Sequence, residues 1–333
     1  MRGRSYNQAM HSAQQTVLIT ETLDESCAAW LQARLPAGSR VLWAKAEDAA
    51  PLDHLLPLAD ALVVRTYTLV NAELLRKAPR LRVVGRAGVG LDNVDLDACK
   101  AAGVRVVSTP DANSQAVVEY VFGLILDHYR PRAPLPRRAD DKTFHALRKT
   151  EVGREIADLT LGIVGMGRIG KRIATVAHAL GMRVLGTDVL PEARIRDELP
   201  QVPFGFVTHA DLYRNSDIVT AHADGRAENK KLMGHGAFQN FGSQAVFINA
   251  ARGMLVDDAA VAAWLCKNPE AHAYLDVHEP EPPPAGNPLW DLPNATLLPH
   301  LASRTDTAMR NMSWVVKDVL AVLEGREPKH PAA

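Results

Sequence analysis

The stretch LGIVGMGRIG at residues 161–170 has the residue types and spacing of a phosphate-binding turn. Gly165 permits a tight turn, Gly167 lets the backbone approach a pyrophosphate, and Gly170 lets the following helix pack closely on the preceding strand. Free N–H groups at the start of that helix would receive the phosphate charge. Asp188, at the end of the next apolar run, would accept hydrogen bonds from a ribose. The pattern predicts a dinucleotide site.

Three later segments contain the groups that reduction of a 2-keto acid requires. An arginine binds the substrate carboxylate and polarises the carbonyl, and an imidazolium donates a proton to the developing alkoxide. A carboxylate keeps that imidazole charged and oriented. The segments read NAARG at 249–253, LDVHEPEP at 275–282 and LPHLAS at 298–303. Each follows a predicted strand, so we expect the three loops to converge at the carboxyl edge of one parallel sheet.

The elements that must position these loops alternate between short apolar strands and helices. Asn71 is placed to cap one of the helices, because its side chain accepts N–H bonds at a helix start. The alternation predicts an α/β fold with two parallel-sheet domains. Strands are expected at 16–20, 61–65, 81–84, 104–107, 183–187, 218–221, 246–249, 272–275 and 295–298, and helices at 95–102, 113–130, 168–180 and 305–324.

Length and composition limit the classes of protein to which this chain can belong. The 333 residues suggest two domains, at about 150 residues per domain. Lys plus Arg and Asp plus Glu both number 38, so the zero net charge gives no general attraction to nucleic acid or membrane. The three cysteines lie far apart without a CxxC pair, which indicates no metal site and no disulfide framework and fits a reducing cytoplasm. Residues 1–15 are polar and are predicted to be a disordered tail rather than a signal peptide, and nothing approaches the roughly 18 apolar residues of a membrane span.

Two further motifs complete a set that resembles a known family. Residues 84–95 read VGRAGVGLDNVD, and residues 108–114 read STPDANS. With these motifs, the glycine turn and the three loops in this order, the chain resembles the D-isomer-specific 2-hydroxyacid dehydrogenases over residues 61–323. It is especially similar to their D-3-phosphoglycerate dehydrogenase branch.

The resemblance implies two domains, of which one is discontinuous. A flavodoxin-like substrate domain is expected at 1–109 and 300–333, and a Rossmann-type NAD-binding domain at 110–299. The chain would cross between them near Pro110 and His300.

The resemblance also implies roles for individual residues. The catalytic places fall on Arg252, Glu281 and His300. Glu281 is preferred to Glu279 because the family's glutamate precedes the proline that ends a DVFxxEP pattern. Asp276 would contact the nicotinamide amide. The residues expected to contact NAD are Gly165, Gly167, Arg168, Ile169, Gly170, Asp188, His222, Ala250 and Asp276, and those expected to contact substrate are Arg65, Ala87, Gly88, Val89 and Arg252.

The sequence departs from the family pattern at two places beside the expected sites. After His222 the chain reads ADGRAEN at 223–229, where the family often has Pro-Leu-Thr followed by another threonine, so the loop beside the cofactor differs. Tyr67 stands where the phosphoglycerate branch often has a small residue, and it would narrow the substrate site. We expect a small substrate without a phosphate, because a phosphate usually needs several charge-assisted bonds and the loops offer Arg65 and Arg86.

The leading interpretation is an NAD-dependent oxidoreductase that interconverts a small 2-keto acid, such as glyoxylate or hydroxypyruvate, and the D-2-hydroxy acid. D-3-phosphoglycerate dehydrogenase is the alternative within the family. An NADH-binding regulatory protein of the corepressor kind is the alternative of another class, since the same fold serves both.

Assembly is predicted from the segment that precedes the glycine turn. Helix 113–130 has an almost wholly apolar face, which requires a partner surface. Residues 131–138 are rich in proline and arginine and form either a solvated connector or an arm that wraps a second subunit. Together with the resemblance they predict a homodimer formed through the NAD-binding domain.

Overall fold

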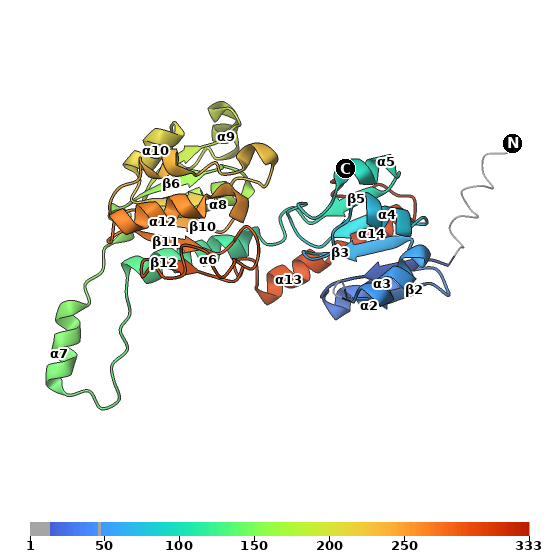
Figure 1. The fold of residues 1–333 in the computed structure, drawn as a ribbon, viewed down its shortest axis with the longest axis horizontal. Coiled ribbons are helices and arrows are strands. Elements are labelled where there is room, and N and C mark those ends of the chain that lie inside the picture. Colours follow the sequence, from blue (N-terminus) through green and yellow to red (C-terminus); the bar gives the residue numbers. More distant parts are fainter. Residues whose placement is uncertain (1–13, 46–47, 333) are drawn as a thin grey trace. The chain divides into compact units, whose positions relative to one another are not determined.

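The computed structural model describes residues 14–45 and 48–332 and divides them into two compact units. Unit 1 contains the described residues up to Asn113 together with those from Thr305 on, and unit 2 runs from Ser114 to Arg304. Each unit has its own parallel sheet and its own helices (Figure 1). The predicted α/β class with two parallel sheets is confirmed. Of the stretch 1–15 predicted as a disordered tail, residues 1–13 lie outside the described part.

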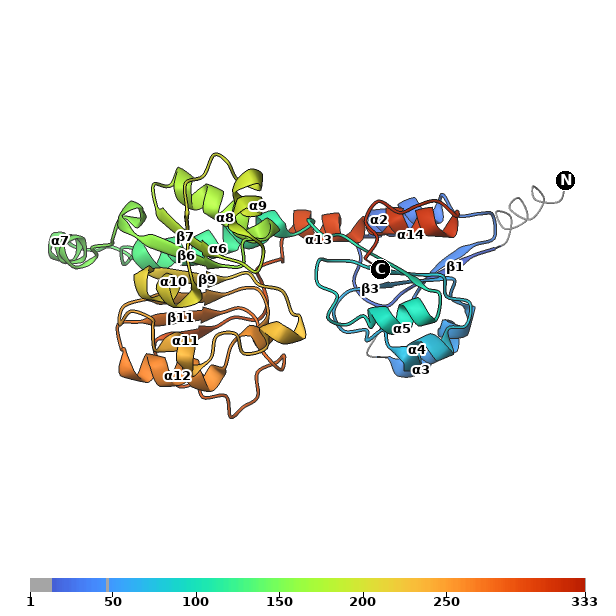
Figure 2. The same ribbon diagram turned by 90° about the horizontal axis from the view of Figure 1, so that it is seen from above.

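Unit 1 is a parallel sheet with helices on both faces. In chain order its elements are β1 (Thr16–Ile19), α2 (Glu25–Gln32), β2 (Arg40–Trp43), α3 (Ala49–Leu55), the 3-10 turn η1 (Leu56–Leu58), β3 (Ala61–Val64), α4 (Ala72–Lys77), β4 (Val83–Arg86), α5 (Leu96–Ala101), β5 (Arg105–Ser108), α13 (Asp306–Ser313) and α14 (Val316–Leu323). The strand order β2-β1-β3-β4-β5 is the flavodoxin-like order. Figure 2 shows α2 and α14 on one face of this sheet and α3, α4 and α5 on the other.

Unit 2 follows the same plan with a wider sheet. Its elements are α6 (Ser114–Tyr129), α7 (Asp141–Thr150), the 3-10 turn η2 (Ile156–Asp158), β6 (Thr160–Val164), α8 (Arg168–Ala179), β7 (Arg183–Thr187), α9 (Glu192–Glu198), β8 (Gly205–Phe206), α10 (His209–Asn215), β9 (Ile218–Ala221), η3 (Ala227–Asn229), α11 (His235–Phe238), β10 (Val246–Asn249), η4 (Gly253–Leu255), α12 (Asp258–Lys267), β11 (His272–Leu275) and β12 (Ala295–Leu297). The parallel strands lie in the order β12-β11-β10-β9-β6-β7-β8. This is the Rossmann order with an added strand, and the order reverses between β6 and β9, where such sheets bind ligands.

Unit 2 has two hydrophobic cores, one on each face of its sheet, because successive side chains along a strand point to opposite faces. Leu161 and Ile163 of β6 are buried in a core shared with α6 and α8. Phe247 of β10 is buried in the other core, which is shared with α10, α11 and α12. Gly162 of β6 leaves room for α10, because a Cβ there would lie 2.6 Å from the Leu212 side chain. The sheet therefore carries helices on both faces, and its carboxyl edge is left to loops.

Most predicted elements are present within one or two residues, and the differences have physical reasons. Several elements are not predicted from the sequence, among them α2, β2, α7, α9, α10 and α12. Of these, β2 is an edge strand without a buried side chain among those described, and α7 likewise contributes none to the core. The helix predicted at 305–324 is two helices, α13 and α14, separated by Trp314 and Val315. Asn71 caps α4 as predicted, with its Oδ1 accepting the Leu74 N–H at 3.0 Å. Within the described ranges, every helix is too short or too polar to span a lipid bilayer.

The apolar face of α6 is covered within unit 2 itself, which corrects the expectation that it requires an outside partner. Val117, Val121 and Ile125 are buried in the core shared with α8 and β6. Beyond α6 the chain leaves the sheet, and both ribbon views show α7 standing apart from it (Figures 1 and 2). α7 has no buried side chain among those described.

The close approach of α8 to the turn after β6 gives a testable prediction. A Cβ at Gly170 would lie 2.1 Å from the Gly165 carbonyl oxygen, so Gly170→Ala must push the helix and the turn apart. We expect this variant to lower the free energy of unfolding by about 1–3 kcal/mol, measured by urea denaturation. Gly236→Ala in α11 is the matched control, because an added Cβ there has no described atom within 4 Å apart from its chain neighbours and the backbone of its own helix. Equal stability of the two variants would contradict this packing.

Candidate active site

The three loops expected to carry catalytic groups lie next to one another in unit 2. β10, β11 and β12 are neighbours, and their register aligns Asn249 with Leu275 and Leu275 with Leu297. The N–H of Asp276 donates to the Asn249 carbonyl at 2.9 Å, and the N–H of Leu298 donates to the Leu275 carbonyl at 2.9 Å. The loops therefore start from one edge of the sheet, as the sequence predicts.

His300 and Glu281 form a direct contact between two of these loops. The Nδ1 atom of His300 lies 2.9 Å from Glu281 Oε2 and 3.1 Å from Oε1. The N–H of His278 also donates to Glu281 Oε1, at 3.1 Å. Burial opposes ionisation of Glu281, but the hydrogen bond and charge of His300 and the His278 N–H outweigh it and hold the pKa of Glu281 below its ordinary value. Glu281 is thus an ionised acceptor in contact with the imidazole.

A buried carboxylate holds the loop that carries His300. Asp276 is 1% exposed and accepts the N–H groups of Leu301 and Ala302, each at 2.8 Å. Tyr120 donates its hydroxyl to the same carboxylate at 3.0 Å, and burial and the Asp276 charge raise the pKa of Tyr120, so the donated proton stays on the phenol. The N–H of His300 donates to the Asp276 backbone carbonyl at 2.8 Å. These bonds keep His300 in the left-handed region, with a φ of 55°, where residues other than glycine are uncommon.

A buried amide shapes the loop that carries Arg252. The Asn249 Nδ2 atom donates to the Arg252 carbonyl at 2.9 Å, and its Oδ1 accepts the Ala251 N–H at 3.1 Å. The Arg252 Nη1 atom donates to the Ala251 carbonyl at 2.6 Å. Gly253 lets this loop pack on the next one, because a Cβ there would lie 2.0 Å from the His278 carbonyl carbon. The arginine loop is therefore fixed against the loop that contains Glu281.

The turn between β6 and α8 fits a pyrophosphate. Gly165 takes a φ of 97°, which favours glycine, and Gly170 packs on the turn as described above. At Gly167, a Cβ would have no described atom within 4 Å apart from its chain neighbours, and no described side chain caps the start of α8. Arg168 and Ile169 begin the helix, with Ile169 half-buried against the core. A glycine turn that leads from a strand into the start of a helix is the arrangement that binds phosphate in dinucleotide sites.

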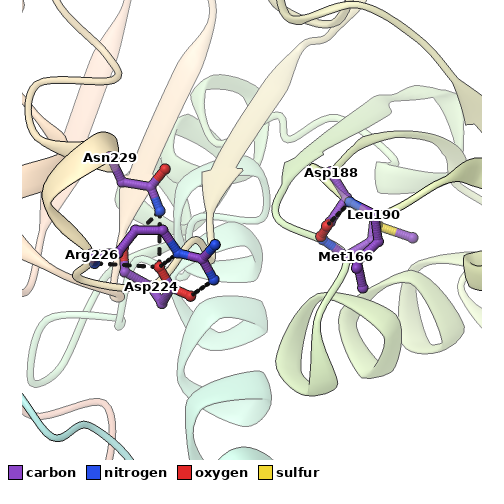
Figure 3. A network of polar contacts seen from close by, with 6 residues as sticks. All are labelled: Met166, Asp188, Leu190, Asp224, Arg226 and Asn229. Atoms are coloured by element: carbon purple, nitrogen blue, oxygen red, sulfur yellow. Dashed lines mark hydrogen bonds and ion pairs between the residues drawn. The ribbon is translucent and has the colours of Figure 1, made fainter. Parts of the chain in front are cut away.

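Asp188 lies beside the glycine turn, where the sequence predicts a ribose contact. Its Oδ2 atom accepts the Met166 N–H at 2.6 Å, and its Oδ1 atom accepts the Leu190 N–H at 2.8 Å (Figure 3). An ionised carboxylate has about four acceptor positions, so these two bonds leave others for ribose hydroxyls. The two backbone hydrogen bonds hold the Asp188 carboxylate in place and leave some of its acceptor positions unused.

His222 lies on the other side of the glycine turn. Its N–H donates to the Val164 carbonyl at 2.7 Å, and its Nε2 atom lies 2.8 Å from Thr220 Oγ1. Burial lowers the pKa of His222 to about 3, so the ring is neutral near pH 7, and its Nδ1 atom has no hydrogen-bond partner among the described residues. Ala250, also expected to contact NAD, is buried at the end of β10.

The first of two loops expected to contact substrate, residues 65–68 of unit 1, is held by Glu21. The Glu21 carboxylate accepts the N–H groups of all four residues at 2.7–3.1 Å. Burial opposes ionisation of Glu21, but the four N–H groups outweigh it and hold the pKa of Glu21 below its ordinary value. The Arg65 Nη2 atom donates to Met309 Sδ at 3.1 Å, and Tyr67 is 77% exposed. The loop is fixed through its backbone, with the Tyr67 ring exposed.

The second of these loops turns directly after β4. The N–H of Ala87 donates to the Val64 carbonyl at 2.8 Å, and the N–H of Gly88 donates to the Arg86 carbonyl at 2.9 Å. Gly88 takes a φ of 152°, and Val89 beside it is half-buried. The structure thus brings the substrate candidates of unit 1 to one edge of its sheet and the catalytic candidates of unit 2 to one edge of the other.

Three residues that shape these loops escape reasoning from the sequence: Glu21, Tyr120 and the side chain of Asn249. Glu21 has a usable signal, because it follows β1 and β3 is the neighbour of β1 in the sheet. Tyr120 has none, since it lies on α6, far along the chain from Asp276. In the part of the chain that the structure describes, no group of three or more His, Cys, Asp or Glu side chains is arranged to hold a metal ion.

Comparison with known proteins adds independent information. Residues 122–302 match the family model described as "D-isomer specific 2-hydroxyacid dehydrogenase, NAD binding domain". The chain is 34% identical over 271 residues to D-3-phosphoglycerate dehydrogenase of Archaeoglobus fulgidus, covering 81% of this chain and 50% of the relative. It is 33% identical over 276 residues to glyoxylate reductase of Aeropyrum pernix, covering 81% and 82%. The crystal structure of the TT0316 protein from Thermus thermophilus superimposes with a TM-score of 0.81 at 31% identity, covering 96% of this chain and 100% of that one. The chain spans about half the length of the D-3-phosphoglycerate dehydrogenases that it matches.

Proposed function

We propose that this chain, which belongs to the family of D-isomer specific 2-hydroxyacid dehydrogenases in the branch similar to D-3-phosphoglycerate dehydrogenases, interconverts a small 2-keto acid and its D-2-hydroxy acid with NAD. The observation that carries the proposal is the contact between His300 and Glu281, at the sheet edge that also bears the Arg252 loop and the glycine turn. We take unit 2 as the NAD-binding domain, since the family model for that domain matches residues within it, and unit 1 as the substrate domain.

The proposed mechanism divides the chemistry between cofactor and protein. When bound, NADH supplies the hydride. Glu281 holds the Nδ1 atom of His300, so Nε2 is the atom left to give a proton to the substrate oxygen. Glu281 stabilises the imidazolium, and Arg252 binds the substrate carboxylate and polarises its carbonyl. In the oxidation direction, a neutral His300 accepts the proton of the hydroxyl group.

The favoured substrate has the size of glyoxylate or hydroxypyruvate. Tyr67 adds an exposed ring to the loop held by Glu21, and such a ring would narrow a substrate site beside this loop. Arg65 and Arg86 are the cations of the two substrate loops, whereas a phosphorylated substrate usually needs several charge-assisted bonds. D-3-phosphoglycerate dehydrogenase activity is the second candidate, and the relatives that bear that name favour it.

A homodimer formed through the NAD-binding domain, in the cytoplasm, completes the proposal. Phe144 and Leu147 lie three residues apart on α7, and so share one side of a helix without a buried side chain among those described. Leu135 and Val152, on either side of α7 in the chain, are also exposed. A second subunit that covered these side chains would remove apolar surface from water.

The dimer is tested by light scattering at micromolar concentration. We expect the parent chain to have the mass of two chains and Phe144→Asp/Leu147→Asp to have the mass of one, because two buried charges would oppose the interface. Leu58→Asp, at an exposed leucine of unit 1, is the control and should leave the dimer intact. A monomeric parent would rule the dimer out.

The substrate is tested by NADH oxidation with glyoxylate, hydroxypyruvate, pyruvate, 2-ketoglutarate and 3-phosphohydroxypyruvate. We expect glyoxylate or hydroxypyruvate to exceed 3-phosphohydroxypyruvate by at least about tenfold in kcat/KM, a difference of about 1.4 kcal/mol in transition-state binding. The reverse order would select the second candidate. Absence of turnover with all five acids, in a chain that binds NADH, would favour a regulatory protein.

The proton-transfer pair is tested by Glu281→Gln, which keeps the shape of the side chain and removes its charge. The imidazole of His300 then loses its charged partner, so we expect kcat/KM for reduction to fall at least about tenfold. Glu279→Gln is the matched control and should stay within about twofold of the parent. Steady-state kinetics of NADH oxidation are the measurement, and an unchanged kcat/KM for Glu281→Gln would exclude Glu281 as the partner.

A further inference from the structure

Two polar groups flank the glycine turn of unit 2, and the proposed function uses only one of them. β9, β6 and β7 are neighbours in this order. The loop after β9 packs on the turn, because a Cβ at Gly165 would lie 2.7 Å from the Ala223 nitrogen. On the other side, the Gly165 N–H donates to the Thr187 carbonyl at 2.9 Å, and Asp188 follows. Residues 224–229 and Asp188 therefore lie on opposite sides of the turn (Figure 3).

The loop after β9 contains an arginine held by a neighbouring carboxylate. Arg226 donates from Nε to Asp224 Oδ1 at 2.7 Å and from Nη2 to Asp224 Oδ2 at 2.5 Å. The Asn229 Nδ2 atom donates to the same Oδ1 at 3.0 Å and fixes the carboxylate (Figure 3). Such a two-point contact is also how a guanidinium binds phosphate. Asp224 thus occupies an edge of Arg226 that a phosphate would use.

The charge of Arg226 is relevant to the choice between the two nicotinamide dinucleotides. NADPH differs from NADH by a phosphate on the 2′ position of the adenosine ribose, and a phosphate monoester carries about −1.5 to −2 charges at pH 7. Asp188 disfavours that phosphate by repulsion. Arg226 is a cation on the other side of the same turn. The hydrogen bond and charge of Asp224 raise the pKa of Arg226, and the charges of Glu228 and Asp188 add to this shift.

We propose that Asp224 is a second determinant of cofactor choice and that it acts through Arg226. By holding the guanidinium, Asp224 withholds a cation from a 2′-phosphate and adds to the preference for NADH that Asp188 creates. Asp224 is a positioning residue in this scheme. The inference rests on the proposed NAD site. It goes beyond that site because it assigns a role to Asp224, in the loop where the sequence departs from the family pattern. If Asp224, Arg226 and Asn229 only braced the loop, their removal would affect both dinucleotides alike.

The test is binding of NADH, NADPH, 5′-AMP and adenosine 2′,5′-bisphosphate to the full chain without substrate, by fluorescence titration and calorimetry. For D224N we expect NADPH and the bisphosphate to bind at least about fivefold more tightly, as one freed charge-assisted contact would produce. Binding of NADH and 5′-AMP should change by less than about twofold, which also shows that the variant folds. R226A should leave NADPH binding within about twofold, because Asp224 already holds the guanidinium, and D224N/R226A should lose the gain.

A matched control removes the same charge elsewhere in unit 2. Asp211 pairs with Arg214 on α10 at 3.3 Å, and D211N should change none of the four affinities by more than about twofold. An equal gain for NADH and NADPH in D224N, or a gain that survives in D224N/R226A, would overturn the inference. A parent chain that binds no NADH would overturn the proposed function itself. A parent that binds NADH, with NADPH affinity unchanged in D224N, would overturn only the role of Asp224.

Discussion

The buried carboxylate of Asp276 accepts three hydrogen bonds from two parts of unit 2. Two come from the backbone after β12 and one from Tyr120 on α6, and the Asp276 backbone carbonyl receives the N–H of His300. A buried charge without partners is costly, so strand, loop and helix must keep these positions together. The location of His300 follows from this one constraint, and so does its reach to Glu281. The geometry of the candidate active site thus depends on Asp276, a buried residue outside the His300–Glu281 pair.

In unit 1, too, a carboxylate holds a loop by accepting hydrogen bonds from its backbone N–H groups. Glu21 accepts four consecutive backbone N–H groups from the loop after β3, as Asp276 accepts two from the loop after β12. Loops at a sheet edge have backbone donors that no neighbouring strand satisfies, and an ionised carboxylate can satisfy several of them. Because the backbone is fixed in this way, side chains such as Tyr67 need not pack inward to hold the loop. Both units therefore hold a loop at the sheet edge through its backbone rather than by packing all of its side chains inward.

Much of this arrangement could be predicted from the sequence, because it depends on local patterns. The apolar strands give the sheets, Gly165 and Gly170 mark the turn that packs on α8, and the rule that parallel strands end at one edge brings the Arg252, Glu281 and His300 loops together. The features that could not be predicted either lack a periodic apolar pattern or depend on contacts between residues far apart in the sequence. β2 and α7 bury too little to show an apolar pattern, and Tyr120 meets Asp276 only because α6 covers the sheet. The Asp224–Arg226 pair was visible only as a departure from the expected motif.

The left-handed backbone at His300 affects how this chain can evolve. Holding a residue with a β-carbon at this φ of 55° costs about 1–2 kcal/mol, and asparagine tolerates the conformation better than histidine does. Replacing His300 by glycine or asparagine would therefore release strain at the same time as it removed the proposed proton donor. On the proposed function, stability and activity are opposed at this position, so selection of variants for heat resistance alone would drift towards glycine or asparagine. Only a selection that also demands turnover would retain the strained residue.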